Sequence, residues 1–102
     1  MAWTVDDSTQ RRVFNQNKHY DVEAASMNKY HQWKRHINDQ GMHPKVAAEA
    51  VGDMHYEQLS GKNKGQYTIR LSQQHRVAFT INDGTKVVNV FQIGGHYPNE
   101  TN

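Results

Sequence analysis

The residues that decide the fold run from Gln66 to Gly84 and read Gln-Tyr-Thr-Ile-Arg-Leu-Ser-Gln-Gln-His-Arg-Val-Ala-Phe-Thr-Ile-Asn-Asp-Gly. Apolar and polar residues alternate here in two runs, and a period of two is typical of a β-strand with one buried face. The Asn-Asp-Gly sequence at the end is a strong signal for a hairpin turn. A third, valine-rich run extends from Lys86 to Ile93. We therefore expect three strands joined by tight turns in an antiparallel order.

The arginines set the register of the first hairpin. If Arg70 pairs with Arg76 across the ladder, the turn is centred on Gln73 and Ile69 lies opposite Val77, which keeps the apolar face continuous. The two guanidinium groups then lie side by side on the other face of the sheet. Because like charges repel, we expect an anion to fill the gap between them.

The register of the second hairpin depends on the length of its loop. If Asp83-Gly84 forms a two-residue loop, Phe79 lies opposite Val88 and Val77 lies opposite Val90. The apolar face stays continuous in this register as well. The opposite face then presents Arg70, Arg76, Asn89 and Phe91.

Helical patterns precede the strands. The best supported helix can be capped by Asp21 and ended by Gly41, and Pro44 begins a shorter one. The buried face of the longer helix comprises Val22, Ser26, Tyr30, Trp33 and Ile37. Nearer the N-terminus, residues 2–5 fit an edge strand, and capping residues after them indicate a further helix to about Lys18. The order predicts one α+β domain over residues 1–102, a small antiparallel sheet with two or three N-terminal helices packed on one face.

Composition excludes several classes of protein. The chain has no cysteine, which rules out disulfides and thiolate metal sites. Its seven histidines show no His-Glu-x-x-His or similar ligand spacing, so we expect neither a metal nor a cofactor. The first residues lack the basic and apolar segments of a signal peptide, and no apolar stretch is long enough to span a membrane. We therefore expect a cytoplasmic protein.

Positive charge is concentrated in one part of the chain. The net charge is only +2, but no acidic residue occurs between Glu57 and Asp83. The basic residues of this segment are Lys62, Lys64, Arg70, His75 and Arg76. A local basic stripe on a nearly neutral domain is typical of a surface that binds phosphate groups.

Cleavage of RNA without a metal needs few groups: a base for the 2′-hydroxyl, an acid for the leaving 5′-oxygen, and cations for the phosphate. Glu57 precedes the first long strand and His96 follows the last, so the two can lie on opposite sides of one phosphate. Histidine suits the role of the acid because its ordinary pKa is about 6.5. Tyr97, next to it, can stack on a nucleobase.

The stretch from Tyr56 to Thr80, together with His96-Tyr97, resembles the core of the RelE/ParE superfamily of toxins. It is most similar to the mRNA endonucleases of the YoeB, RelE and HigB type. These proteins have an acidic residue before a segment with leucine and glycine, an arginine on the first long strand, His-Arg at the start of the next strand, and His-Tyr near the C-terminus. The matching positions here are Glu57, Leu59, Gly65, Tyr67, Arg70, His75, Arg76, His96 and Tyr97.

The resemblance implies the toxin of a type II toxin–antitoxin system. Such a toxin cleaves mRNA in the A site of the 70S ribosome and is held inactive by a cognate antitoxin protein. By position, Glu57 would be the general base and His96 the general acid. Arg76 would stabilise the pentacoordinate phosphate with support from Arg70, and Tyr97 would position the nucleotide. The residues that would bind the RNA are Lys62, Lys64 and His75.

Other assignments stay open at this point. HigB-like relatives rely more on lysine than on glutamate, which leaves the general base open between Glu57 and a lysine. ParE-like members of the same fold poison gyrase and usually lack the His-Tyr pair, so Glu57 and His96 argue against that function. A non-catalytic RNA-binding module would need the basic face but neither of these two residues.

Overall fold

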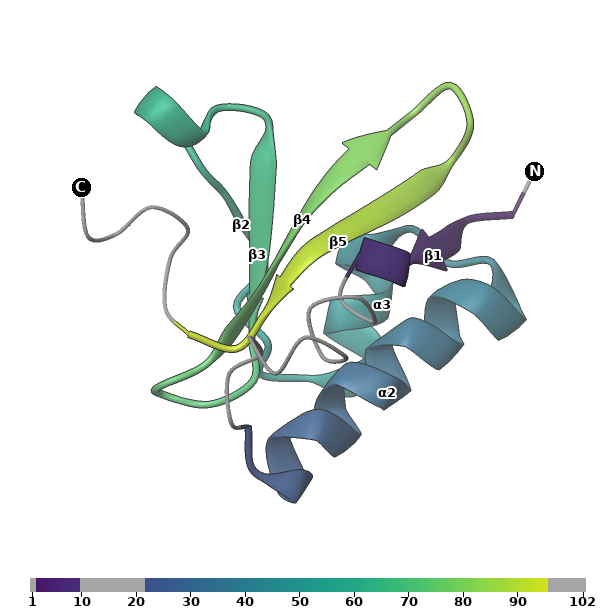
Figure 1. Ribbon diagram of the computed structural model, residues 1–102. Coiled ribbons are helices and arrows are strands. Elements are labelled where there is room, and N and C mark those ends of the chain that lie inside the picture. The colour runs from purple at the N-terminus through teal and green to yellow at the C-terminus, as the bar shows by residue number, and fades with distance from the viewer. Residues whose placement is uncertain (1, 10–21, 96–102) are drawn as a thin grey trace.

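The computed structural model describes residues 2–9 and 22–95, which contain a five-stranded sheet and two α-helices. The strands are β1 (Thr4–Asp6), β2 (Glu57–Gln58), β3 (Gln66–Arg70), β4 (Arg76–Asn82) and β5 (Val87–Ile93). The helices are α2 (Ala24–Gln40) and α3 (Pro44–Val51), and a 3₁₀ helix, η1 (Gly61–Asn63), connects β2 to β3. Figure 1 shows α2 and α3 on the same side of the sheet. The predicted α+β architecture is confirmed.

The strands lie in the order β1-β5-β4-β3-β2. The edge strand predicted near the N-terminus is present as β1, which runs parallel to β5 with Val5 opposite Val88. The other neighbouring strands are antiparallel. The second edge, β2, was not predicted, because two residues are too few to show a period.

The first hairpin has the predicted register, with Arg70 opposite Arg76 and Ile69 opposite Val77. The second hairpin does not. Phe79 lies opposite Val90 rather than Val88, and a bulge between Ala78 and Phe79 brings Val77 opposite Ile93.

The loop of the second hairpin explains this difference. Asn82 pairs with Val87, which leaves Asp83 to Lys86 outside the ladder. The side-chain oxygen of Asn82 accepts a hydrogen bond from the backbone N–H of Thr85 at 3.0 Å, and this closes a longer turn than Asp-Gly alone would make. The shift in register is by two residues at Phe79, so its side chain still faces the core.

Helix α2 buries the face that its period predicted, formed by Ser26, Tyr30, Trp33 and Ile37. It begins at Ala24 with Glu23 as the N-cap residue, and Asp21 lies outside the described residues. It ends at Gly41, whose φ of 69° lets its N–H reach the carbonyl of Ile37. The helix predicted to extend to about Lys18 lies, beyond residue 9, outside the described part of the chain. None of the helices in that part combines the length and the apolar composition that a membrane span requires.

Aromatic rings form the centre of the core between α2 and the sheet. The ring of Trp33 lies 5.1 Å from that of Phe79, which in turn stacks on Tyr67 at 5.9 Å. The indole N–H of Trp33 donates to the carbonyl of Pro44 at 3.0 Å, which ties α2 to the start of α3. The core therefore fixes both helices against one face of the sheet and leaves the other face for the site.

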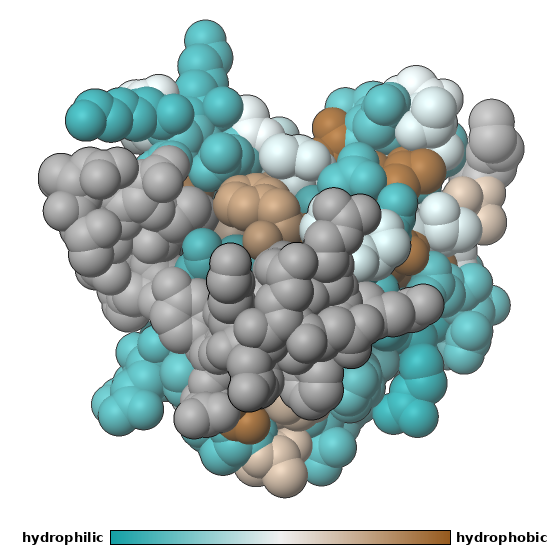
Figure 2. Space-filling view, viewed as in Figure 1, coloured by the Kyte–Doolittle hydropathy of each residue, from teal (hydrophilic) through white to brown (hydrophobic). Residues whose placement is uncertain are grey.

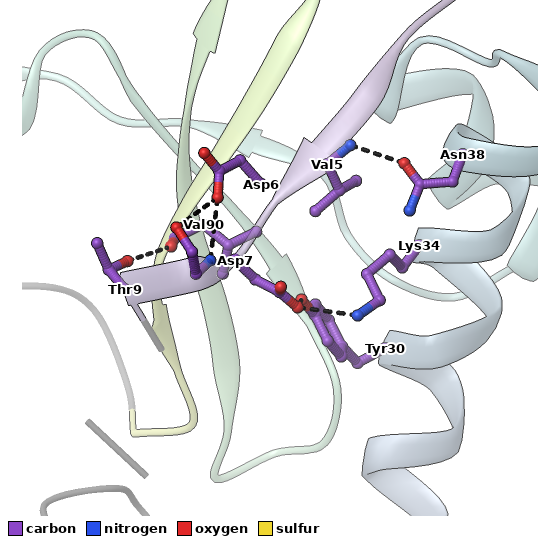
Figure 3. Close-up of polar contacts among 9 residues, drawn as sticks. Val5, Asp6, Asp7, Thr9, Tyr30, Lys34, Asn38 and Val90 are labelled. Carbon is purple, nitrogen blue, oxygen red and sulfur yellow. Dashed lines mark hydrogen bonds and ion pairs between the residues drawn. The ribbon is translucent and has the colours of Figure 1, made fainter. Parts of the chain in front are cut away.

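The segment around β1 is attached to α2 by polar contacts, which Figure 3 shows. Asp7 accepts a hydrogen bond from the hydroxyl of Tyr30 at 2.7 Å and an ion-paired one from Lys34 at 2.9 Å. The backbone N–H of Val5 donates to the side chain of Asn38 at 2.8 Å. Burial alone would raise the pKa of Asp7, but the hydrogen bonds from Lys34 and Tyr30 outweigh it, and the pKa is lowered.

Candidate active site

The candidate catalytic residues share the face of the sheet that the helices do not cover. Glu57 on β2 lies opposite Thr68 on β3, and Arg70 lies opposite Arg76. Residues directly opposite each other point to the same side, and so do residues two apart along a strand. Because Thr68 and Arg70 are two apart on β3, their partners Glu57 and Arg76 lie on the same surface as Arg70.

Arg76 is held rigidly within this surface. Only 4% of the surface of Arg76 is exposed to solvent. Thr68 Oγ1 accepts from its Nε at 3.0 Å and from its Nη2 at 2.8 Å, and the backbone carbonyl of His55 accepts from Nη2 at 3.1 Å. Glu57 Oε1 lies 3.5 Å from the same Nη2. A buried guanidinium with these partners has a fixed orientation beside the Glu57 carboxylate.

Arg70 has a different partner. Its Nη2 lies 3.4 Å from Asp53 Oδ1, and the Asp53 side chain is 83% exposed. The repulsion between Arg70 and Arg76 is therefore relieved by two carboxylates of the protein, one for each guanidinium. The anion expected between the two arginines stays a prediction, and the pattern of the strands did not reveal the Asp53 carboxylate that the preceding loop supplies.

Glu57 is approached by a second side chain that the sequence reasoning did not single out. His55 Nε2 lies 3.8 Å from Glu57 Oε1, and 63% of the His55 side chain is exposed. Glu57 is itself 36% exposed in its side chain, so its carboxylate is accessible beside the buried Arg76. The proximity of a histidine two residues before the carboxylate was the signal available in the sequence.

The loop before β2 supplies these additional contacts. Asp53 and His55 both have positive φ angles, 56° and 43°, which residues other than glycine adopt rarely. Between them, Met54 is buried in the core, and its carbonyl accepts from the backbone N–H of Arg70. Strained backbone of this kind is found where the surrounding structure fixes a functional geometry. Here it directs the His55 carbonyl to Arg76 and the Asp53 carboxylate to Arg70.

His75 was predicted to bind RNA, and the structure places its ring within the protein. The side chain is 13% exposed, and its Nε2 lies 3.9 Å from Glu23 Oε2 at the start of α2. Its Nδ1 accepts a hydrogen bond from the backbone N–H of Gly95 at 3.0 Å. The ring therefore connects the β3–β4 turn to the chain after β5.

Lys62 and Lys64 lie on the exposed connection between β2 and β3, at and just after η1. This connection precedes Gln66, the first residue of β3, whereas Arg70 is the last. The lysines thus lie at the other end of β3 from the arginine pair. Hydrophilic side chains project from this region at the upper left of Figure 2.

His96 and Tyr97 lie outside the described residues. The chain that leads to them is placed: the Gly95 carbonyl accepts from the backbone N–H of Arg76 at 2.8 Å, and the Gly94 N–H donates to the Arg76 carbonyl at 2.9 Å. The chain therefore leaves the sheet beside Arg76. Among the described residues, no group of three or more histidine, cysteine or acidic side chains could hold a metal ion.

Comparison with known proteins identifies the fold. No protein-family model matches the sequence, and no curated protein does. Among solved structures, a YoeB/ParE toxin from Agrobacterium tumefaciens matches with a TM-score of 0.58 at 19% identity, covering 95% of this chain and 100% of the toxin. The YoeB dimer from Staphylococcus aureus matches with a TM-score of 0.54 at 19% identity, covering 95% and 98%.

YoeB of Staphylococcus aureus also matches, with the same scores, as the toxin in a heterotetrameric YoeB-YefM toxin–antitoxin complex. At this level of identity the likeness shows the fold. The chain has the fold of the YoeB/ParE toxins, and the fold that the sequence resemblance implied is confirmed.

Proposed function

We propose that this protein is the toxin of a type II toxin–antitoxin pair and that it cleaves mRNA in the A site of the 70S ribosome. The observation that carries the proposal is the cluster on the open face of the sheet. There the accessible Glu57 carboxylate lies 3.5 Å from the buried, fixed guanidinium of Arg76, beside the point where the chain leads to His96-Tyr97. A YoeB-like fold with this cluster supports the same conclusion.

The proposed reaction needs no metal. Glu57 takes the proton from the 2′-hydroxyl, whose oxygen attacks the adjacent phosphorus, and Arg76 stabilises the charge that develops on the pentacoordinate phosphate. His96 protonates the 5′-oxygen as the P–O5′ bond breaks. The products are a 2′,3′-cyclic phosphate and a free 5′-hydroxyl, and Tyr97 stacks on the nucleobase.

The two arginines have different roles in this proposal. Because Arg76 is buried and fully oriented before RNA arrives, it can stabilise the transition state without reorganising. Arg70 is paired with the highly exposed Asp53, and such pairs are weak. A phosphate of the RNA can replace Asp53 on Arg70, while Lys62 and Lys64 contact the RNA backbone farther along β3.

The proposed partner of the toxin is an antitoxin protein. The YoeB of Staphylococcus aureus, whose fold this chain shares, forms a complex with YefM. We propose that this protein likewise binds a cognate antitoxin, and that it acts in the cytoplasm, where the ribosomes are.

The test is primer extension on an mRNA after brief expression of the protein in translating cells. We expect cuts within codons, only on translated RNA, and none with the matched variant Glu57→Gln, which keeps the shape of the side chain. Removal of a general base should slow cleavage ~10²–10⁴-fold. Growth arrest without cuts would overturn the proposed nuclease activity and favour gyrase poisoning. If the protein caused neither cuts nor growth arrest, the proposal of a toxin would be overturned, and an RNA-binding module would remain as the alternative.

A further inference from the structure

Hydrogen bonds fix the backbone of His75 at the end of the β3–β4 turn. Its carbonyl accepts from the backbone N–H groups of Leu71 at 2.9 Å and Ser72 at 3.1 Å. Its own N–H donates to Ser72 Oγ at 3.2 Å. With its backbone fixed on both sides and its side chain mostly buried, the ring has a defined position. The ring points inward, toward Gly95, and not toward a surface where RNA would lie.

The ring accepts a hydrogen bond through one nitrogen and faces a carboxylate with the other. Nδ1 accepts from the N–H of Gly95 at 3.0 Å, and Nε2 lies 3.9 Å from Glu23 Oε2. The hydroxyl of Ser26 donates to the other carboxylate oxygen of Glu23 and lowers the pKa of that residue. The ring thus offers an acceptor to one segment and a donor edge to a carboxylate on another. Lysine or arginine in its place would offer donors alone.

The contact with Gly95 completes a clamp on the chain before His96. The clamp consists of three hydrogen bonds: Gly94 N–H to the Arg76 carbonyl, Arg76 N–H to the Gly95 carbonyl, and Gly95 N–H to His75 Nδ1. Gly94 and Gly95 have φ angles of 94° and 72°. Two consecutive glycines allow many backbone directions, so a fixed exit from the sheet depends on bonds of this kind.

We infer that His75 is a positioning residue: its ring fixes the backbone of Gly95, the residue directly before His96, beside Arg76. This inference rests on the proposed function, in which His96 is the general acid, and it replaces a role for His75 in binding RNA. A displacement of a catalytic group by about 1 Å can slow a reaction ~10²-fold. The clamp should therefore act on the rate of cleavage and leave the binding of the substrate unchanged.

The test compares His75→Asn with His75→Leu, two side chains of nearly the same shape. The Asn side-chain oxygen lies close to the position of Nδ1 and can accept from Gly95, whereas Leu has no acceptor. On ribosomes programmed with mRNA, we expect His75→Leu to lower kcat ~10–100-fold with KM unchanged, and His75→Asn to restore most of kcat. A rise in KM with kcat unchanged in both variants would overturn the inference and return His75 to the RNA-binding residues.

Hydrogen exchange of the Gly95 amide, measured by NMR on the free protein, provides a readout that does not depend on activity. We expect faster exchange in His75→Leu than in the wild type and in His75→Asn. Equal exchange in all three would overturn the clamp even where the wild type cleaves mRNA. If the wild type does not cleave translated mRNA, the proposed function fails, and the exchange rates still decide whether His75 holds Gly95. Should His75→Leu not fold, His75→Phe carries the same comparison.

Discussion

Thr68 determines how Arg76 is oriented, although neither its position nor its side chain marks it as functional in the sequence. It is completely buried, and its hydroxyl oxygen accepts from both Nε and Nη2 of the guanidinium. The sequence predicts Arg76, at the start of β4, as a phosphate ligand, because this residue lies in a segment without acidic residues. Its burial was not predictable, since burial depends on Thr68 and on the His55 carbonyl, which come from two other segments.

Replacement of Thr68 by valine should therefore weaken both stability and cleavage. The substitution keeps the shape and leaves donors of a buried guanidinium without their acceptor, so unfolding free energy should fall by about 1–3 kcal/mol. We expect kcat to fall ~10-fold or more through misplacement of Arg76. Urea unfolding and the ribosome assay measure the two effects. Thr68→Ser, which keeps the oxygen, should restore kcat, and Thr80→Val on the same face serves as control. A loss of kcat in Thr80→Val as large as in Thr68→Val would show that the effect does not pass through Arg76.

At the scale of the elements, the termination of α2 decides how the helix meets the N-terminal segment. Gly41 has a φ of 69°, and a Cβ placed there would lie 2.8 Å from the Cβ of Ala2. Trp3 also donates its backbone N–H to the Gly41 carbonyl, at 3.4 Å. The glycine thus provides both the left-handed backbone that ends the helix and the space for the chain that leads into β1.

Gly41→Ala should destabilise the protein more than Gly61→Ala. Both positions have positive φ, 69° and 65°, but a Cβ at Gly61 meets no atom of the described residues within 4 Å. The shared backbone strain should cost about 1 kcal/mol or more in each variant. The additional loss in Gly41→Ala reports the clash with Ala2, and urea unfolding of the two variants measures it. Equal midpoints and slopes in both variants would mean that the N-terminal segment moves away at no cost.

For the molecule as a whole, stability depends on contacts between segments far apart in the sequence. Asp7 joins the segment after β1 to α2 through Tyr30 and Lys34 (Figure 3). Its pKa is lowered in the folded protein below the ordinary aspartate value, because these two hydrogen bonds outweigh the opposing effect of burial. A group with a depressed folded pKa contributes stability above its unfolded pKa and loses that contribution as the pH falls through its folded pKa. The protein should therefore lose part of its stability below about pH 4.

Asp7→Asn should lower the unfolding free energy at neutral pH by about 1 kcal/mol, since solvent screens part of the ion pair. The variant should also lose less stability than the wild type between pH 5 and pH 3, a window set by the ordinary aspartate pKa of about 4. Urea unfolding at a series of pH values measures both effects. Asp6→Asn is the comparison: the Asp6 carboxylate accepts hydrogen bonds from Ser8, two residues away, which lower its pKa, so this variant reports the pH effect of a local contact. An unchanged pH dependence in Asp7→Asn would show that Asp7 is not coupled to folding.

The sequence by itself determined what depends on local periodicity. The alternation from Gln66 to Ile81 and the three–four spacing from Ser26 to Ile37 predicted which faces are buried, because side-chain direction follows the period of the backbone. The resemblance to the RelE/ParE toxins rested on residues in the same part of the chain, and the fold it implied is confirmed.

The tertiary structure alone decided which side chains meet. Contacts between residues far apart in the sequence leave no periodic signal, so Asp53 with Arg70, Thr68 with Arg76 and His75 with Gly95 could not be predicted. The same holds for the register of the second hairpin, which a single side-chain hydrogen bond in its loop decides. Three-dimensional packing determines these pairs because each depends on the simultaneous placement of several backbone segments.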